Sequence, residues 1–412
     1  MSTAPSTDQP RFAEFVALMA TLMSLVALSI DAMLPALGEI GRDLQAPRAN
    51  DVQLVVALIF AGMSVGQLAY GPLSDSVGRK PALLAGLALY MGGCVVSMAA
   101  RSFSVMLVGR LIQGLGVAAP RVISIALIRD RYEGRRMARV MSFIMAVFIT
   151  VPIVAPSLGQ GLLLVASWRA IFGAFLVIAV AASAWFTLRQ PETLAAERRI
   201  PFSPSRVAAG FAAVVRIRSA LGYTVAAGLV FGAFVGYLST AQQVFQELYG
   251  LGSRFPLYFA ALAMALGVAS LLNTRLVMRF GMRPLVRTAL WAIAALSGAW
   301  LVPVYVSGGQ PPLWSLMAYL LAVFLCEGTL YGNMTALAME PLGHLAGVGS
   351  AVVGALSLFI SMLGGTIIGR AYDGSVVHLV AGFGVLALAA LAVTWWTEAG
   401  PELSQEATRA GR

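Results

Sequence analysis

Three charged residues inside long apolar runs are the chemically distinctive feature of this sequence. Asp31, Arg110 and Glu327 each lie well within such a run. A charge withdrawn from water is costly unless it is paired, neutralised or hydrated. We therefore expect Asp31 to be either a neutral acid or a carboxylate held by a cation. Helical rise places Arg110 ~10 Å inside its run, at a depth similar to that of Asp31.

A change of partner at Asp31 would couple two transport events. Its carboxyl group can hold a proton, a cationic substrate or the Arg110 guanidinium, and each partner excludes the others. This is a minimal element of antiport. The candidate proton-coupling residues are Asp31, Arg110 and Glu327. The alternatives are structural: a static ion pair at Asp31, and at Arg110 a side chain that snorkels outward and stabilises topology.

Small and polar residues in the run over 220–246 predict two further features. Gly228, Gly232 and Gly236 recur at a spacing of four, which favours close packing against another helix. The polar and aromatic groups that follow them predict the lining of a cavity. The candidate substrate-cavity residues are Asp31, Gln113, Arg121, Tyr237, Gln242, Glu327 and Asn333.

The sequence excludes several other chemistries. Lys80 is the only lysine and lies in GRKP, so the G-x-x-x-x-G-K-[ST] loop that binds nucleotide phosphates is absent. His344, His378, Cys94 and Cys326 are too few and too scattered for a metal site. No nucleophile and base constellation or appended soluble domain is visible. We expect no cofactor, no metal and no enzymatic activity, with a proton gradient as the energy source.

The elements that position these residues must be membrane helices. The chain of 412 residues is 59% hydrophobic and 11% charged, with a mean hydropathy of +0.84, whereas soluble domains are roughly a quarter charged. Spanning a bilayer takes ~20 apolar residues. Twelve runs are long enough: 12–35, 52–73, 81–100, 103–128, 137–162, 168–188, 220–246, 255–278, 284–306, 313–339, 346–369 and 376–397.

The basic residues predict the orientation of these helices. With both termini inside, the inner segments hold 20 arginines and lysines and the outer segments hold six. This bias predicts cytoplasmic termini and contact with anionic lipid of the inner leaflet. The formal net charge of +10 is then explained by topology and does not indicate nucleic acid.

The longest polar interruption divides the sequence into halves. We predict an N-terminal six-helix bundle over 1–188, a cytoplasmic linker over 189–219 and a C-terminal six-helix bundle over 220–412. GRKP at 78–81 returns as GMRP at 281–284, in each half between the second and third runs. Such a repeat is typical of transporters that bind substrate between two halves.

The loop after the second run carries a recognisable motif. It reads GPLSDSVGRKP over 71–81, in which Gly78 permits a tight reversal and Asp75 can pair with Arg79 and Lys80. This string resembles the signature loop of the major facilitator superfamily. The resemblance implies that Gly71, Asp75, Gly78, Arg79 and Lys80 latch the cytoplasmic helix ends in one conformation.

Two further strings resemble motifs of that superfamily. Arg110, Gln113, Gly114 and Gly116 match its fourth-helix motif, whose arginine is tied to proton coupling. The run over 137–162 contains VPIVAPSLGQG, which is similar to the antiporter-associated fifth-helix motif. It supplies Pro152, Pro156 and Gly159 and predicts a bent helix pressed against a neighbour, although Ala155 and Gln160 replace two of the motif's glycines.

Strings along nearly the whole chain resemble the bicyclomycin and chloramphenicol resistance branch of drug:proton antiporters. They include IDAMLPAL, SWRAIF, FQELYGL, LLNTRLVMRFGMRP and NMTALAM. The resemblance implies a single polypeptide of the bacterial inner membrane, all-α and monomeric, that exports amphipathic drugs in exchange for protons. Met33 stands where the branch usually has a tyrosine, and Ile125 where it often has an arginine.

Arg121 lies one helical turn before Ile125, so the branch's arginine is displaced along the helix, and Glu327 is not expected from the branch. In the superfamily fold the fourth and tenth helices line opposite cavity walls, and Arg121 and Glu327 differ in depth by about 6 Å. We hypothesise an ion pair between the halves that forms in one conformation and breaks in the other, or that substrate displaces. The alternative is that cavity water solvates each residue separately.

Three other functions remain open on the sequence. A dedicated exporter of one metabolite or toxin would share every motif. A proton-independent facilitator would keep its flux after Asp31→Asn. A membrane enzyme or receptor on a transporter scaffold is disfavoured by the absence of catalytic motifs noted above.

Overall fold

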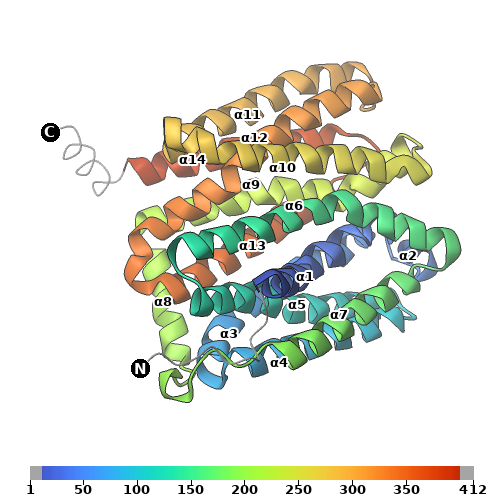
Figure 1. The fold of residues 1–412 in the computed structure, drawn as a ribbon. Helices are drawn as coiled ribbons and strands as arrows, with labels where there is room; N and C mark the ends of the chain where they lie inside the picture. The colour runs from blue at the N-terminus through green and yellow to red at the C-terminus, as the bar shows by residue number, and fades with distance from the viewer. Residues whose placement is uncertain (1–11, 400–412) are drawn as a thin grey trace. The chain divides into compact units, whose positions relative to one another are not determined.

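The chain folds into long helices. The computed structural model describes residues 12–399, apart from the side chains of 344–346, and this part of the chain contains no β-strand (Figure 1). Twelve helical segments in the described range are long and apolar enough to cross a membrane, which confirms the predicted number of spans. The protein is therefore a multi-pass membrane protein.

The first half of the chain contributes six spans and several short helices. In chain order these are α1 (Phe12–Asp31), the 3-10 helix η1 (Leu34–Ala36), α2 (Leu37–Asp43), the 3-10 helix η2 (Ala49–Gln53), α3 (Leu54–Val77), α4 (Arg79–Met98), α5 (Phe103–Arg131), α6 (Gly134–Val165) and α7 (Arg169–Arg189).

The linker and the second half follow the same plan. They comprise the 3-10 helix η3 (Ala196–Arg198), α8 (Pro204–Arg216), α9 (Arg218–Gln242), the π-helix η4 (Gln243–Leu248), the 3-10 helix η5 (Gly252–Arg254), α10 (Phe255–Phe280), α11 (Met282–Val306), α12 (Leu313–Met339), the 3-10 segment η6 (Glu340–Leu345), α13 (Ala346–Arg370) and α14 (Val377–Glu398).

The first span departs from its predicted form. The apolar run over 12–35 predicts one helix, whereas α1 ends at Asp31 and a 3-10 turn precedes α2. Pro35 explains the break, because proline lacks a backbone N–H and disfavours the α conformation in the residue before it. Asp31 is therefore the last residue of its helix.

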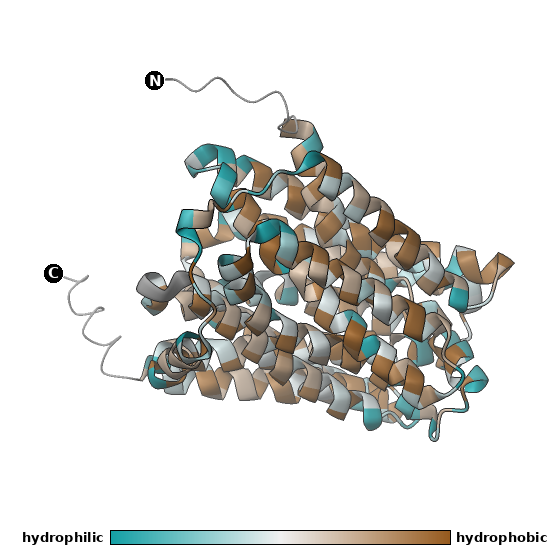
Figure 2. Cartoon of the chain, turned by 90° about the horizontal axis from the view of Figure 1, so that it is seen from below, coloured by the Kyte–Doolittle hydropathy of each residue, from teal (hydrophilic) through white to brown (hydrophobic). Residues whose placement is uncertain are grey.

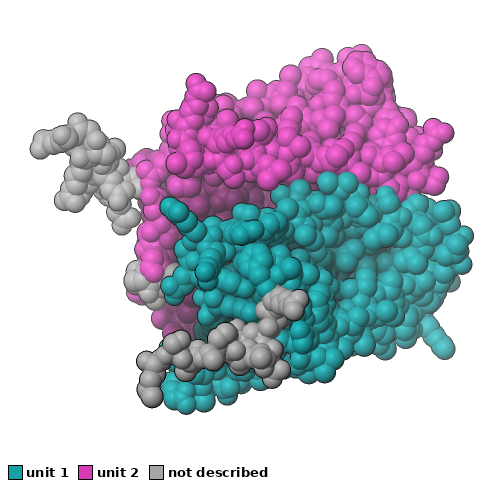
Figure 3. All heavy atoms as spheres, viewed as in Figure 1, with its two compact units in different colours: residues 1–47, 58–204 teal, residues 48–57, 205–412 magenta. Residues whose placement is uncertain are grey.

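Contacts divide the chain into two compact units (Figure 3). Unit 1 comprises residues 1–47 and 58–204, and unit 2 comprises 48–57 and 205–412. The division at 204 falls inside the predicted linker. The assignment of 48–57 to unit 2 was not foreseen, because this segment contains the start of the second span of the first half.

The two related turns found in the sequence share one backbone feature. Gly78 separates α3 from α4 with a φ of +108°, and Gly281 separates α10 from α11 with a φ of +79°. A positive φ is disfavoured for residues with a Cβ. GRKP and GMRP therefore encode the same kind of helix-to-helix reversal, one in each half.

The glycine stripe of α9 packs as predicted. A Cβ at Gly228 would lie 2.7 Å from Cβ of Ile360, and one at Gly236 would lie 2.8 Å from Cδ1 of Ile368. Both partners belong to α13. The absence of side chains on the stripe therefore lets α9 and α13 approach closely.

The surface is apolar along the helices. Figure 2 shows hydrophobic residues along the helix lengths and hydrophilic ones mainly at helix ends and in connecting segments. Met278, Val306 and Val177 are exposed large hydrophobic residues. Such extensive apolar exposure would be unfavourable in water, and a lipid surround accounts for it.

Candidate functional site

Arg110 on α5 is the most deeply buried charge of unit 1. None of its surface is exposed. Its Nη2 donates to the Ser29 carbonyl at 2.9 Å, and its Nη1 donates to Oε1 of Gln113 at 2.5 Å. The guanidinium carbon lies 5.8 Å from the ring centroid of Phe172. These contacts take the place of water around the charge, so Arg110 does not snorkel outward.

Two hydrogen bonds extend this arrangement into neighbouring helices. Nε2 of Gln113 donates to Sγ of Cys94 at 3.2 Å, and the hydroxyl groups of Ser29 and Tyr90 lie 2.7 Å apart. We call Ser29, Tyr90, Cys94, Arg110 and Gln113 the arginine network; it joins α1, α4 and α5. Sequence analysis missed Ser29, Tyr90 and Cys94, although each is a polar residue within an apolar span.

Asp31 lies at the end of α1, two residues beyond the carbonyl that accepts from Arg110. Its exposure is 5%. Within the described residues of unit 1, its carboxyl group makes no hydrogen bond and no ion pair, so the static pair with Arg110 is not formed. A buried carboxyl group without a partner favours the neutral acid over the carboxylate.

The proline-containing helix α6 closes against the residue after Asp31. A Cβ at Gly159 would lie 1.8 Å from the carbonyl oxygen of Ala32. Only a glycine permits this approach without displacing the backbone. Pro152 and Pro156 lie on the same helix, within the two turns before Gly159. The predicted close contact of this helix is confirmed, and its neighbour is the end of α1.

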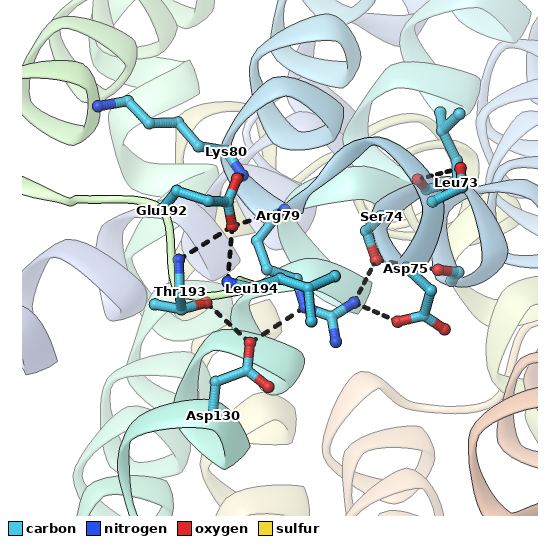
Figure 4. A network of polar contacts seen from close by, with 11 residues as sticks. Leu73, Ser74, Asp75, Arg79, Lys80, Asp130, Glu192, Thr193 and Leu194 are labelled. Atoms are coloured by element: carbon cyan, nitrogen blue, oxygen red, sulfur yellow. Dashed lines mark hydrogen bonds and ion pairs between the residues drawn. The ribbon is translucent and has the colours of Figure 1, made fainter. Parts of the chain in front are cut away.

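A second set of polar contacts lies around the loop between α3 and α4 (Figure 4). Arg79 contacts Asp75 through Nη1 at 2.5 Å and Asp130 through Nε at 3.1 Å. Nη1 also donates to the Ser74 hydroxyl at 2.8 Å. The predicted pairing of Asp75 with Arg79 is confirmed. The arginine joins the end of α3 to the end of α5.

The linker takes part in this arrangement through Glu192, which sequence analysis missed. Its Oε1 and Oε2 accept from the backbone N–H groups of Arg79 and Lys80, each at 3.0 Å. The carboxylate thereby caps the N-terminus of α4 from a distant part of the chain. The Thr193 hydroxyl donates to Asp130 at 2.7 Å. We call Asp75, Arg79, Asp130, Glu192 and Thr193 the loop latch.

Lys80 and the two glycines of the motif hold the loop latch in place. Nζ of Lys80 donates to the carbonyl oxygens of Thr187 at 2.7 Å and Gln190 at 2.9 Å. Gly78 provides the positive φ of the turn, and the Gly71 carbonyl accepts from the Ser74 hydroxyl at 2.9 Å. These contacts fix the helix ends to the first residues of the linker.

Glu327 on α12 is the buried acid of unit 2. Its exposure is 5%, and within the described residues of that unit it makes no hydrogen bond and no ion pair. Further along α12, Asn333 exchanges two amide hydrogen bonds with Asn273 on α10, at 2.9 and 3.2 Å. The pairing of Glu327 with Arg121 would join the two units and stays a prediction.

Tyr237 and Gln242 lie inside unit 2. The Tyr237 ring contacts those of Phe259 and Phe324, with centroids 5.8 and 4.8 Å away. Nε2 of Gln242 donates to Glu247 at 3.1 Å. Both residues are at most 4% exposed. Their role as cavity lining stays a prediction, and so does that of Arg121, which is half-buried on α5.

The described part of the chain holds no cluster of three or more His, Cys, Asp or Glu side chains that could ligate a metal ion. The buried carboxyl, amide and guanidinium groups can bind protons, form hydrogen bonds and form ion pairs. Asp31 and Glu327 are the two buried carboxyl groups among the described residues.

Comparison with known families agrees with this architecture. The sequence profile of the Major Facilitator Superfamily matches residues 17–365. The chain is 31% identical over 362 residues to an uncharacterised MFS-type transporter, YdgK, of Bacillus subtilis, covering 85% of this chain and 87% of the relative. It is 31% identical over 356 residues to a bicyclomycin resistance protein homolog of Haemophilus influenzae, covering 86% and 88%.

A shorter match and a solved structure add to this comparison. The chain is 32% identical over 160 residues to the multidrug resistance protein MdtL of Escherichia coli, covering 39% of this chain and 41% of the relative. The inward-open, partially occluded xylose transporter XylE of E. coli has a similar fold. Its TM-score is 0.72 at 14% identity, covering 93% of this chain and 97% of that one.

Proposed function

Because this chain belongs to the major facilitator superfamily and is a multi-pass membrane transporter, we propose that it exports amphipathic drugs in exchange for protons by alternating access. The observation that carries the proposal is the placement of Asp31. It is a buried carboxyl group without a partner in its unit, two residues from the carbonyl that holds Arg110.

The chemistry of Asp31 suits a group that loads and releases a proton. In its buried position the neutral acid is favoured. When the proton leaves, the carboxylate needs a cation, which either Arg110 or a cationic substrate can supply. Proton and substrate then compete for one site, which is the requirement for exchange.

The proton gradient is a sufficient energy source. One charge that crosses 100 mV contributes about 2.3 kcal/mol, and each pH unit adds about 1.4 kcal/mol. One proton can therefore sustain a substrate gradient of roughly a hundredfold or more. ATP and a cofactor are not needed under this proposal.

The proposed membrane location and orientation rest on the distribution of basic residues and on the relatives. We place the chain in the bacterial inner membrane with both termini in the cytoplasm, acting as a monomer. Two relatives carry the names bicyclomycin resistance protein homolog and multidrug resistance protein. These names support amphipathic drugs as the substrate class.

The test is the pH change that drug addition causes in proteoliposomes. The wild type, Asp31→Asn and Asp43→Asn are compared over a panel of cationic, neutral and anionic amphipathic compounds. Asp43 is the matched control, because its half-exposed carboxylate is already occupied by Arg169. We expect protons to move opposite to the drug in the wild type and in Asp43→Asn, and not in Asp31→Asn.

Other outcomes point to the alternatives. Drug flux without proton movement contradicts antiport and indicates a facilitator. No response to any compound of the panel contradicts a broad drug specificity and favours a dedicated exporter of one metabolite or toxin.

A further inference from the structure

The segment Arg48–Ala57 belongs to unit 2, although it leads into the second span of the first half and contains the first residues of α3. Helix α3 is continuous from Leu54 to Val77, so it begins in unit 2 and continues in unit 1 from residue 58. Any motion of one unit relative to the other must therefore either detach this segment or deform α3.

Two buried amide side chains attach the segment to unit 2. Nε2 of Gln53 donates to Oε1 of Gln243 at 2.5 Å, and Nε2 of Gln243 donates to Oδ1 of Asn50 at 3.1 Å. Gln53 and Gln243 are each 3% exposed. The two bonds form a short chain of amides from η2 to the end of α9.

A second set of contacts attaches the segment to the end of α13. Nδ2 of Asn50 donates to the carbonyl oxygens of Arg370 at 3.2 Å and Tyr372 at 2.5 Å. The Arg370 guanidinium lies 3.8 Å from the Asp51 carboxylate. Asn50 thereby accepts from one helix end and donates to another.

Gly369 makes room for Gln53. A Cβ at this position would lie 1.8 Å from Oε1 of Gln53 and 3.5 Å from Cβ of Ser239. A side chain at 369 would therefore displace the Gln53 amide. Ser239 lies beside the same contact and is 2% exposed, so the attached segment helps to cover it.

The attachment has features of a contact that is made and released. It consists mainly of hydrogen bonds between neutral amides, and each of these costs less free energy to break than a buried ion pair does. Oε1 of Gln53 has no hydrogen-bond partner among the described residues, so its bonding is incomplete. Gln243 is the first residue of the π-helix η4, a form of helix that is frequent at functional sites.

We propose that Asn50, Asp51 and Gln53 form a clasp with Gln243 and Arg370 that must open when the transporter opens to the outside. The three segments involved follow the first, seventh and eleventh spans, and all three are predicted to lie at the outer end. This inference rests on the alternating access proposed above. The clasp residues decide whether α3 is held by unit 2 or is free to move with unit 1.

Accessibility of a cysteine beneath the clasp tests the inference without proton or drug. The reporter is Ser239→Cys in a Cys326→Ala background, in lipid nanodiscs with a hydrophilic maleimide; Cys94 is buried and stays in place. Gln53→Ala removes the amide, and Gly369→Ala displaces it. Gly298→Ala is the matched control, because a Cβ there would meet nothing within 4 Å.

We expect the labelling rate of the reporter to rise about tenfold with Gln53→Ala or Gly369→Ala and to stay within about twofold of the parent with Gly298→Ala. Parental rates in both clasp variants, or an equal rise in the control, overturn the clasp. Because this measurement needs no substrate, its result is independent of whether proton antiport is observed.

A cross-link tests the same contact without weakening it. Gln53→Cys with Gln243→Cys places two thiols at positions whose native side chains touch. In proteoliposomes and in the Cys326→Ala background, a bifunctional methanethiosulfonate reagent that spans the length of two glutamine side chains should stop drug flux, and a reductant should restore it. Full flux through the cross-linked protein contradicts the requirement that the clasp opens.

Discussion

Few residues take part in the proposed proton coupling, and their partners differ from those expected. Arg110 bonds to a main-chain carbonyl and an amide, and it leaves the nearby Asp31 without a bond in its unit. The hydrogen bonds of Arg110 stabilise its charge without using the Asp31 carboxyl group, so Asp31 remains available to bind a proton. This arrangement is the central physical feature of unit 1.

Arg110 donates hydrogen bonds to two groups at once, and this predicts the effect of replacing it with lysine. Arg110→Lys retains the charge but cannot reach the Ser29 carbonyl and the Gln113 amide with a planar fork. We expect the initial rate of drug transport to fall about tenfold or more, because a hydrogen bond to a charged group contributes about 1.5–3 kcal/mol and about 1.4 kcal/mol is a factor of ten. Arg287→Lys, at an exposed arginine that contacts Glu398 through Nη2, should transport like the wild type. Equal rates for both variants would contradict the role given to the arginine network.

The charge on Glu192 should stabilise the loop latch. Glu192→Gln keeps the side-chain length but removes the charge that caps the first N–H groups of α4. We expect a loss of stability of about 1 kcal/mol, seen as earlier thermal unfolding in detergent. Glu197→Gln, in the same linker and exposed, serves as the control. No difference between the two variants would exclude the capping role.

The elements themselves were predictable from sequence because a membrane helix needs only an unbroken apolar run of sufficient length. The end of α1 was not, since its position depends on Pro35 within that run. The Gly228, Gly232 and Gly236 stripe was predictable because its spacing is helical. Glu192 was not, because capping of α4 by the linker is a contact between distant parts of the chain.

The close approach of α6 to α1 leads to a prediction with a matched control two residues away. A Cβ at Gly159 would meet the Ala32 carbonyl oxygen, whereas one at Gly161 would meet nothing within 4 Å. Gly159→Ala should displace α6 from the residue beside Asp31, lower the thermal unfolding temperature and weaken proton coupling. Gly161→Ala should leave both unchanged. The proton-to-drug flux ratio measures the coupling in both variants. Equal ratios for Gly159→Ala and Gly161→Ala would show that the contact is only structural.

The whole molecule was predictable to the level of two six-helix halves, because the runs, the central linker and the paired glycine turns all recur. The location of 48–57 was not, since no local pattern says that this segment contacts Gln243 and the end of α13. For the same reason the sequence did not reveal the clasp. Its residues are ordinary polar residues near helix ends.

The orientation of the whole molecule is tested by labelling in intact cells. Gln310 and Glu197 are exposed and lie at opposite predicted sides of the membrane. A membrane-impermeant maleimide should label Gln310→Cys and should label Glu197→Cys only after the cells are permeabilised. The reverse pattern would contradict the predicted topology.

We propose that a proton carried by Asp31 drives export, and uphill accumulation of a drug measures that drive. Proteoliposomes with an acidic lumen are given a labelled drug, with wild type beside Asp31→Asn and the Asp43→Asn control. We predict that the wild type and the control concentrate the drug inside, that an ionophore which collapses the pH gradient abolishes the accumulation, and that Asp31→Asn only equilibrates the drug. Accumulation by Asp31→Asn equal to that of the wild type would show that Asp31 does not carry the proton that drives export.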